Sequence, residues 1–525
     1  MTLITTPQAW SNEQQRWSRF YAGRLPEQLR AAAARIDATP PEALQSHFDT
    51  FLSLLNATGG RAELAPLWLA LVARLHPLPV RWGQWAAWLA ILRQAALKAK
   101  ALNQPARQAE YLAYEADLLL NVGRLAPALD TARQALALGR RNGAAWPLAV
   151  AGNAASATLR SLARYDEAQA IIDENRADLA RMERPRPAAR AAMAIALLDL
   201  EEMDLLRYFK RLDDALALGE SLIARLAAVE GVDPHDLAMV YLRRATIVWV
   251  SGRYQAAAED LRRSAKLYRA AGNSLQAVFA GGNLGVVYYS MSRYVEAEAL
   301  MLAAIRAAEE TNARYRLVSD LGDLSVVYIA LGRMDLAYDY TDRMVRLAGE
   351  LGNTAELSRG RGNRGYALLG LGRYEEALPD IEFSLDLYRQ QGRIEGILVT
   401  TIDLIIYLRG IGDEEQAARV AEENYAAARR ESYPHLHIVT ARCLALFPPA
   451  ERQRTLLEEA LALAREHERP LDEAGCLFSL AGLAEDATAR NALYGEGVRL
   501  LQQMGATGWL AGKSPANPPL LPMTI

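Results

Sequence analysis

Cysteine and histidine are scarce in this sequence, which has 2 cysteines and 6 histidines among 525 residues. Cys443 and Cys476 are too few for a disulfide framework and fit a reducing compartment, where both would be small core residues. His435 and His437 are two positions apart, so on a helix they diverge and could not bind one zinc ion together. No HExxH pattern occurs, so the sequence predicts no metal site.

Net charge and long apolar runs are also lacking. The 59 basic and 62 acidic residues leave a formal charge of −3, which gives no overall attraction to nucleic acid or anionic lipid. The most apolar segment, Leu64 to Ala73, is about half as long as the ~20 residues of a membrane-spanning helix. The first 15 residues have neither a basic leader nor an apolar stretch long enough for export. We therefore expect a cytoplasmic protein that binds neither nucleic acid nor membrane.

What the sequence does contain favours helices. Hydrophobic residues make up 51% of the chain, and the β-branched and aromatic residues never gather into alternating runs. A chain of 525 residues is longer than one hydrophobic core usually serves. The composition thus predicts an all-α protein, built either from several domains or from a stack of small helical units.

A 40-residue period supports the stack. Alanine recurs without exception at five positions, Ala257, Ala297, Ala337, Ala377 and Ala417. Earlier in the chain the spacing is irregular, because Ala215 follows Ala168 by 47 residues and precedes Ala257 by 42. We expect an insertion within residues 197–210, as a distorted turn or an extra helical turn.

Each period contains two helices. Ala297, Leu300, Met301, Ala304 and Ala308 have the spacing of a single apolar stripe on one helix. Second helices of this kind are predicted to end at residues that tolerate a left-handed backbone, namely Gly272, Asn312, Gly352 and Gly392. Acidic residues at the starts of the second helices fit the helix dipole. The repeating unit is therefore a helical hairpin.

The run LGVVYYSMSRYVEAEALMLAAI, residues 284–305, resembles the tetratricopeptide repeat (TPR). The matching positions are Leu284, Gly285, Tyr288, Tyr294, Ala297, Met301 and Ala304. The 40-residue period is similar to the long-helix variety of signalling scaffolds and of the sensor regions of bacterial signal-transduction ATPases. The resemblance implies an all-α, TPR-like α-solenoid, a right-handed superhelix of antiparallel helix pairs whose first helices line a concave groove.

The repeats divide the chain into five predicted regions. Residues 1–60 form a helical N-terminal cap, and residues 61–230 form degenerate to moderate repeats, with Trp88 where the first hairpin should have alanine. Residues 231–430 form five regular repeats, 431–508 shorter C-terminal hairpins, and 509–525 a proline-rich tail that we expect not to pair with the repeats.

The family geometry predicts a peptide-binding groove lined mostly by apolar and small residues. Its predicted contact residues are Met239, Thr246, Trp249, Phe279, Val286, Tyr289, Val326, Ile329, Arg359, Tyr366 and Leu369. The lysine and asparagine clamp with which some family members bind a C-terminal carboxylate is not matched. An apolar groove suits the apolar face of a helix or an extended segment with bulky side chains. This interpretation requires Tyr289 and Tyr366 to be accessible to solvent.

Three alternatives stay open for this surface. The groove could be occupied by the protein's own terminal helices or by its tail, for instance Pro518 to Ile525. A polar ladder, Asn283, Asp323, Asn363 and Asp403, could bind a peptide backbone or serve the repeat structure. The arginines Arg359, Arg361 and Arg364 could form a solvated helix face or bind an acidic partner.

No pattern supports catalysis. Gly360, Gly362 and Gly365 match GxGxxG, but no strand precedes them, so we interpret them as packing glycines. The run GWLAGKS, residues 508–514, lacks the first glycine of a phosphate-binding loop. Neighbouring carboxylates such as Asp213 and Asp214 diverge on a helix. The sequence predicts no enzyme, no catalytic residue and no cofactor.

The leading hypothesis is a scaffold for signal transduction that binds a protein or peptide in the groove. The alternative is a stand-alone sensor or regulatory module, in which a small ligand or a partner changes the superhelix and a separate effector responds. The identity of the partner and the oligomeric state are not determined by the sequence.

Overall fold

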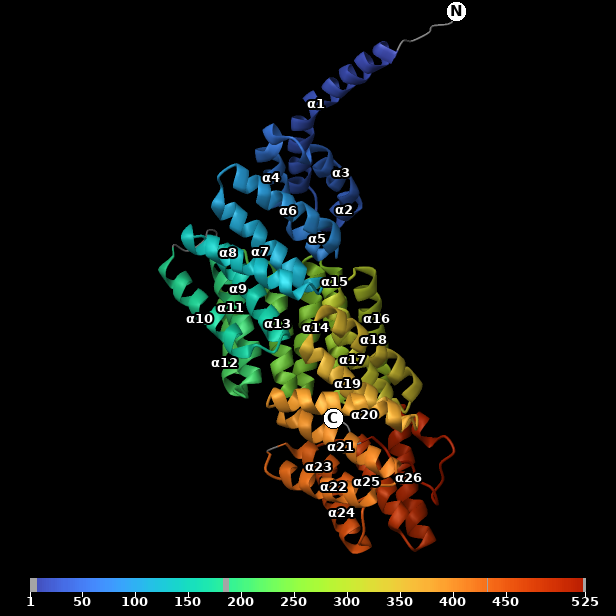
Figure 1. Cartoon of the computed structure of the whole chain (residues 1–525). Helices are drawn as coiled ribbons and strands as arrows, with labels where there is room; N and C mark the ends of the chain where they lie inside the picture. Colours follow the sequence, from blue (N-terminus) through green and yellow to red (C-terminus); the bar gives the residue numbers. More distant parts are fainter. Residues whose placement is uncertain (1–6, 183–187, 432, 523–525) are drawn as a thin grey trace, which may run out of the picture. The chain divides into compact units, whose positions relative to one another are not determined.

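The computed structural model in Figure 1 describes residues 7–182, 188–431 and 433–522. These residues form helices joined by short turns, and an isolated bridge between Ser514 and Asn517 is the only β-type pairing in these ranges. The predicted all-α class is confirmed. Among the helices of these ranges, none combines the length and the hydrophobicity that a membrane crossing demands.

The chain divides into two compact units. The first consists of Met1–Leu159, Asp166–Arg243 and Ser264–Ala277, and the second of Arg160–Tyr165, Arg244–Arg263 and Val278–Ile525. Five regular repeats are predicted for residues 231–430, and the boundary between the units runs through the first two of them.

The N-terminal helices of the first unit differ in length. They are α1 (Pro7–Ala38), α2 (Pro41–Leu44), η1 (Gln45–His47), α3 (Phe48–Gly59), η2 (Ala62–Leu64), α4 (Ala65–Leu75), α5 (Pro77–Arg81) and α6 (Trp85–Ala101). Trp88, on α6, is fully buried, and its indole nitrogen donates to His76 Nδ1 at 3.1 Å. His76 lies at the break between α4 and α5. The bulky indole that replaces the repeat alanine is thus packed where the first helix of the hairpin is interrupted.

More regular helix pairs follow in the first unit. They are α7 (Pro105–Asn121), α8 (Leu125–Arg141), α9 (Ala145–Ser161), α10 (Tyr165–Arg181), α11 (Ala188–Tyr208) and α12 (Leu212–Ala227). Helix α11 has 21 residues, whereas α7 to α10 have 17 each. Four of the seven extra residues between Ala168 and Ala215 therefore form an additional turn of α11. The other three lie in the connection 182–187, of which 183–187 are outside the described residues.

Helices of the regular repeats have nearly equal lengths. They are α13 (Pro234–Val250), α14 (Tyr254–Ala270), α15 (Ser274–Ser290), α16 (Tyr294–Glu310), α17 (Arg314–Leu331), α18 (Met334–Leu351), α19 (Thr354–Gly370), α20 (Tyr374–Gln390), α21 (Ile394–Gly410) and α22 (Glu414–Ala428). Most have 17 residues and are joined by turns of three residues, which accounts for the 40-residue period. The chain ends with α23 (Pro434–Leu444), α24 (Ala450–Glu466), α25 (Pro470–Leu483), α26 (Ala487–Met504) and η3 (Thr507–Leu510).

Left-handed residues terminate the helices, as the sequence predicted. Gly332 closes α17 with φ of 74°, and Gly352 closes α18 with φ of 66°. Where glycine is replaced, Ser292 and Asn312 still adopt φ values of 58° and 52°. The same backbone is therefore imposed at each turn of the regular repeats from Gly252 to Gly412, and non-glycine residues accept its strain because the packing of both flanking helices fixes the turn.

The predicted register of the hairpins is confirmed by burial. The five repeat alanines, Ala257, Ala297, Ala337, Ala377 and Ala417, are each 0% exposed. The GxGxxG glycines lie inside α19 and are packing glycines, because a Cβ on Gly365 would lie 2.9 Å from Ile381 Cγ1. Small residues at these positions allow the two helices of a hairpin to approach closely.

The proline-rich tail differs from expectation. It was predicted not to pair with the repeats, yet Leu521 is 1% exposed and Pro519 and Pro522 are buried. Leu521 belongs to the same hydrophobic cluster as Leu331 and Tyr366 of the repeats. Leucine and proline are apolar enough to pack without regular structure, provided that their backbone carbonyls find donors.

Candidate functional site

The first helices of successive repeats form one continuous wall in the second unit. Helices α17, α19, α21 and α23 contact one another in turn, whereas the second helices of the pairs make their main contacts with first helices. A stack whose first helices lie closer together than its second helices curves toward the first helices. The inner wall, defined here as the inward faces of α15, α17, α19 and α21, is therefore the concave surface of this unit.

The predicted groove residues fall into two groups by burial. Seven keep partial exposure: Met239, Thr246, Trp249, Val286, Tyr289, Val326 and Arg359. Four are buried: Phe279 (3% exposed), Ile329 (1%), Tyr366 (7%) and Leu369 (6%). Met239 belongs to the first unit, and the other ten belong to the second. The expectation that Tyr366 faces solvent is wrong, because this side chain is part of the hydrophobic core.

A polar strip crosses α17 and α19 near their N-terminal ends. We define it as Arg316, Ser319, Asp320, Asp323, Glu356 and Arg359. Arg316 donates from Nε to both carboxylate oxygens of Asp320, at 2.8 and 2.9 Å. Between the two helices, Arg359 donates to Asp323 at 2.6 Å, and the Ser319 hydroxyl donates to Glu356 at 2.9 Å. The strip therefore fixes the spacing of α17 and α19 by paired charges.

Burial and neighbouring charges shift the pKa values of the polar strip. Burial raises the pKa of Asp320 to about 6, although Arg316 opposes this shift. Burial lowers the pKa of Arg359, but Glu356 and Asp323 more than offset it, so the guanidinium pKa is raised. The side chains of Arg316 and Arg359 are still 24% and 30% exposed. These cations are thus both held in place and accessible from the inner wall.

Nearer the C-terminal ends of α15, α17 and α19 the wall is apolar. We call this the apolar zone and define it as Val286, Tyr289, Ile329, Ala330, Leu331 and Tyr366. Burial raises the pKa of Tyr289, and the charges that act on this phenol include Arg469 and Asp472 at the start of α25. Burial likewise raises the pKa of Tyr294 to about 12, with Asp472 adding to the shift. Helix α25 therefore approaches the apolar zone.

The C-terminal segment, residues 505–522, also lies against the apolar zone. The indole nitrogen of Trp509 donates to the backbone oxygen of Ala330 at 3.0 Å. Gly508 lies so close to α17 that a Cβ on it would be 2.5 Å from the Leu331 oxygen. Of the alternatives for this surface, a contact with the protein's own C-terminus is seen at the end of α17. Of the segment Pro518 to Ile525 named there, residues 523–525 lie outside the described residues.

A buried arginine attaches the end of this segment to the repeats. Arg442, on α23, has a side chain that is 0% exposed, and it donates to Asp472 at 2.7 Å. It also donates to the backbone oxygens of Leu521 and Pro522, at 3.1 and 3.0 Å. The two carbonyls of an irregular tail thereby obtain the donors that buried backbone groups require.

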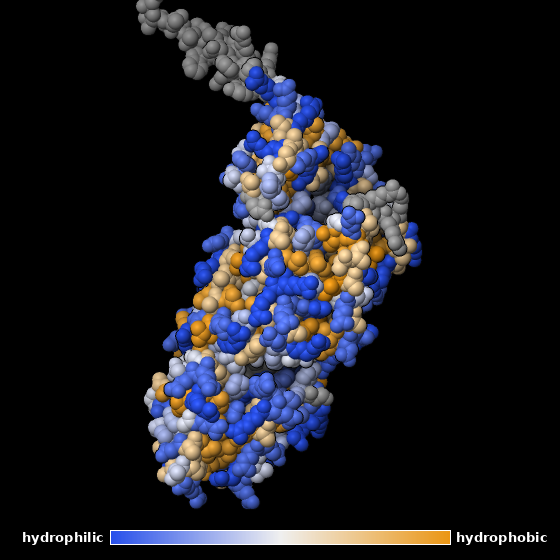
Figure 2. Space-filling model, turned by 180° about the vertical axis from the view of Figure 1, so that it is seen from behind, coloured by the Kyte–Doolittle hydropathy of each residue, from blue (hydrophilic) through white to orange (hydrophobic). Residues whose placement is uncertain are grey.

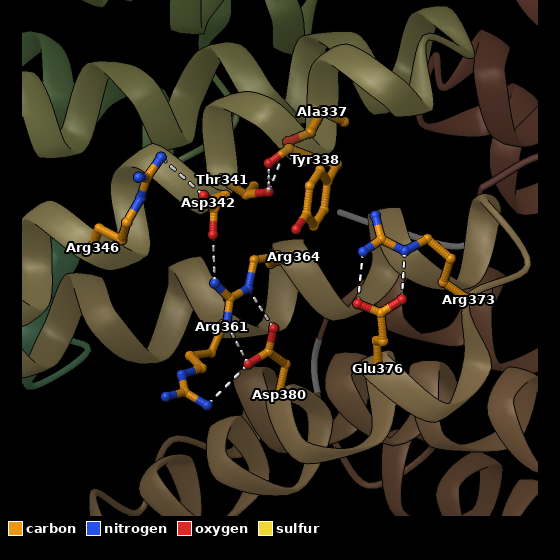
Figure 3. A network of polar contacts seen from close by, with 10 residues as sticks. All are labelled: Ala337, Tyr338, Thr341, Asp342, Arg346, Arg361, Arg364, Arg373, Glu376 and Asp380. Carbon is orange, nitrogen blue, oxygen red and sulfur yellow. Dashed lines mark hydrogen bonds and ion pairs between the residues drawn. The ribbon is translucent and has the colours of Figure 1, made fainter.

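The arginines of α19 are not a solvated face. Figure 3 shows Arg364 between two carboxylates, with Asp342 of α18 on one side and Asp380 of α20 on the other. Arg361 donates to the same Asp380 at 3.0 Å, and Asp380 is only 2% exposed. With Arg359 paired in the polar strip, the three charges join neighbouring helices, and their side chains keep 18% to 30% exposure. Ion pairs between helices therefore account for the position of this cluster.

The residues of the predicted polar ladder do not share one role. Asp323 accepts a hydrogen bond from Arg359, and the Asn363 amide is 3.4 Å from the Ser325 hydroxyl. Asp403 is 4% exposed, and burial raises its pKa well above the ordinary value. Equivalent positions in successive repeats thus have different environments, so the ladder does not form a continuous rail for a peptide backbone.

A second polar network, in the first unit, was not predicted from the sequence. Trp146 of α9 donates to the Tyr114 hydroxyl of α7 at 2.8 Å, and Tyr114 donates to Glu110 at 2.8 Å. Arg190 of α11 pairs with Glu110 and lies 4.7 Å from the centre of the Trp146 ring. The network joins three successive first helices.

Part of this network can be found by counting residues from the start of each first helix. Glu110 is the sixth residue of α7, as Phe279 is of α15, and Asp117 of α7 corresponds to Val286. Burial, with Glu201 adding to it, raises the pKa of Asp117 to about 6. The spacing around α11 is irregular, so steps of 40 residues back from the groove positions of α15 do not reach the equivalent residues of α7.

The described residues contain no group of three or more histidine, cysteine, aspartate or glutamate side chains that could hold a metal ion. The face shown in Figure 2 mixes hydrophilic and hydrophobic residues. Large exposed apolar side chains such as Leu97 on α6, Val295 on α16 and Ile411 in the turn after α21 belong to separate elements. The inner wall is therefore the best-defined candidate site.

Paired helices, 40-residue spacing and a concave wall of first helices define a TPR-like α-solenoid, the class to which many binding and regulatory proteins belong. A solved Rap protein, in complex with competence and sporulation factor, has the same fold with a TM-score of 0.51 and 13% identity, covering 69% of this chain and 98% of that one. No family model matches the sequence.

A curated relative was found for part of the chain. Regulatory protein AfsR of Streptomyces coelicolor is 30% identical over 122 residues, which is 23% of this chain. The match spans only 12% of AfsR, about an eighth of its length.

Proposed function

We propose that this chain binds a peptide or protein partner on the inner wall of its second unit. The observation that carries the proposal is the polar strip, in which Arg316 and Arg359 are fixed by ion pairs yet remain partly exposed. Charges that are fixed in advance lose little side-chain freedom when a partner binds, so they contribute to affinity and select partners by charge.

Predicted contact residues beside the strip remain candidates for this role. Thr246, Trp249, Val286, Tyr289 and Val326 are half-buried side chains that could contact a partner directly. The buried residues Phe279, Ile329, Tyr366 and Leu369 support the wall from within. A mixed surface of this kind suits a polypeptide that presents polar groups to the strip and apolar side chains beside it.

The likeness to the Rap protein supports the proposal by analogy of fold, since that structure was solved with competence and sporulation factor bound. A second candidate function, a stand-alone regulatory module that responds to a small ligand or a partner, is favoured by the local match to the regulatory protein AfsR. In that case a change in the solenoid would be transmitted to a separate effector.

Site-specific photo-cross-linking tests the binding surface. A photoreactive amino acid would replace Val326 on the inner wall or, as a control, Leu336, which is 37% exposed on α18. We expect the inner position to capture a partner that the control position does not. Adding Arg359→Ala should reduce this capture about tenfold while the circular dichroism stays unchanged. Capture of the same proteins from both positions would show that the inner wall is not the binding surface.

The regulatory alternative predicts a different result. Small metabolites would then raise the melting temperature of the full chain, and the inner-wall position would capture no protein. Thermal-shift screening therefore separates the two functions.

A further inference from the structure

The contact between Trp509 and Ala330 is not an ordinary end cap of the solenoid. In a repeat stack each unit contacts its neighbours, so a terminal cap should cover only the last repeat. Trp509 and Ala330 are 179 positions apart in the chain. The last hairpin returns the chain to this place, because Leu501 and Met504 of α26 lie in the same hydrophobic cluster as Leu331, and residues 508–509, which follow α26, contact the end of α17.

The contact also has the chemistry of a recognition event. A helix leaves its last carbonyls without intrahelical donors, and the Trp509 indole supplies a donor to one of them, on Ala330. Next to it, a Cβ on Gly508 would collide with the backbone oxygen of Leu331. A Cβ on Gly332 would lie 2.7 Å from the backbone nitrogen of Trp509. A Gly-Trp pair thus fits this helix end because glycine allows the two backbones to approach and the indole provides the hydrogen bond.

The segment is held at its two ends, and its middle is exposed. Between η3 and the tail, residues 511–514 are exposed, and so are Ala516, Asn517 and Leu520. Ala506, Pro519, Leu521 and Pro522 are buried, and Trp509 and Leu510 are half-buried. The exposed middle makes few buried contacts and opens at the lowest free-energy cost.

We propose that residues 505–522 are an internal ligand of the inner wall, which a partner polypeptide with a Gly-Trp-Leu turn displaces. The proposal rests on the function proposed above and specifies its regulation. In the closed state the segment covers the apolar zone, and the polar strip is left open. A partner bound to the strip gains the apolar zone when it replaces the segment, so binding is coupled to release of the C-terminus.

The first test uses a synthetic labelled peptide with the sequence of residues 505–522, GATGWLAGKSPANPPLLP, added to the full chain. In the natural chain the tethered segment competes at an effective concentration of about millimolar. Trp509→Ala should weaken this competitor and increase the affinity for the added peptide at least tenfold. Leu520→Ala, which changes an exposed residue of the same segment, should leave the affinity unchanged.

A peptide in which the tryptophan is replaced by alanine should not bind to the Trp509→Ala chain. Circular dichroism and thermal melting would show that this chain is folded. If the folded variant bound the natural peptide no more tightly than the unchanged protein does, the internal-ligand proposal would be wrong.

A reversible cross-link gives a second test that does not depend on removing the tryptophan. A Cβ on Gly505 would lie 2.9 Å from Val295 Cγ2. The Cβ atoms of Val295→Cys and Gly505→Cys would therefore be no more than about 4.4 Å apart, within the range of a disulfide. Cys443 and Cys476 are buried and should not interfere. The oxidised variant should bind the peptide at least tenfold more weakly than the reduced one, and equal binding would overturn the proposal.

The same disulfide between positions 295 and 505 distinguishes this inference from the proposed function. If the reduced and oxidised forms captured the cross-linked partner equally well, the inner wall would bind a partner without release of the segment, and the inference would fail alone. If the peptide bound as described but no partner were captured at Val326, the inference would stand and the proposed function would fail.

Discussion

The two units use the same helix pairs but differ in what their first helices present. In the first unit, a polar network of Glu110, Tyr114, Trp146 and Arg190 joins the first helices. In the second unit, the corresponding wall has an open polar strip and an apolar zone, and residues of the C-terminal segment such as Trp509 cover the apolar zone. The comparison shows that one repeat architecture can present polar or apolar walls.

The largest effect is expected from a variant that breaks one unit and spares the other. Ala337→Arg places a long cation where the side chain is 0% exposed between α17 and α18. Overpacking and burial of an unpaired charge should lower the free energy of unfolding of the second unit by several kcal/mol. Calorimetry or hydrogen exchange should show this loss in the second unit, with the first unit retained. Leu336→Arg, at an exposed position of the same helix, should cost less than about 0.5 kcal/mol.

An equal loss of unfolding free energy in Ala337→Arg and Leu336→Arg would contradict the hairpin register. The register makes residue 337 an inward position and residue 336 an outward one, so only the first should be sensitive to size and charge.

A smaller effect is expected from the ion pairs of the second unit. Arg364 and Asp380 occupy positions that hold Leu404 and Val420 in the next repeat, so the same cross-helix contact is ionic in one hairpin and apolar in the other. Asp380→Asn removes one charge of a buried network and should cost about 3 kcal/mol. The double change Arg364→Leu with Asp380→Val should cost less than the single one, because Asp342 keeps its pair with Arg346 and the side chain of Arg361, which loses Asp380, is 30% exposed.

Denaturant unfolding of the single and double variants checks this prediction. A double variant that is less stable than Asp380→Asn would show that the charges contribute more than apolar packing at this position. The control is Glu376→Gln, whose pair with Arg373, drawn in Figure 3, is largely exposed and should contribute little to stability.

The smallest effect concerns pH and the first unit. Burial lowers the pKa of His76 to about 3, while the unfolded chain takes up this proton near the ordinary value of 6.5. Between these values the unfolded state binds more protons, so the contribution of His76 to stability falls as the pH falls from 6.5 to 3. His76→Asn keeps an acceptor for Trp88 and cannot titrate. It should flatten the dependence of the first unit's melting temperature on pH in this range.

The acidic groups with raised pKa, such as Asp117, are present in both proteins, so the difference between variant and parent isolates His76. An unchanged slope in His76→Asn would show that this ring is protonated equally in the folded and unfolded chains.

The period itself was predictable because each hairpin repeats the same local requirements. Ala337 and its equivalents must be small where two helices cross, and Gly332 must adopt a left-handed backbone where a helix ends. Both requirements are met within about 40 residues of chain, so they appear directly as a spacing. The same reasoning identified the packing role of Gly365.

The candidate site was less predictable. The sequence placed Tyr289, Val326 and Arg359 on first helices, and the structure finds them half-buried there. It could not distinguish them from Tyr366 and Ile329, which the structure buries. Helical periodicity fixes which way a side chain points, but not whether another part of the chain covers it.

Sequence alone thus determined the helix pairs, their register and their class, because these depend on side chains close together in the chain. Only the tertiary structure decided that Arg442 holds the backbone of Leu521 and that Trp509 caps α17. These contacts join residues 79 and 179 positions apart, and the donors and carbonyls that form them have no sequence spacing that marks them as partners. Their geometry exists only once the repeats have stacked and the last hairpins have been placed beside them.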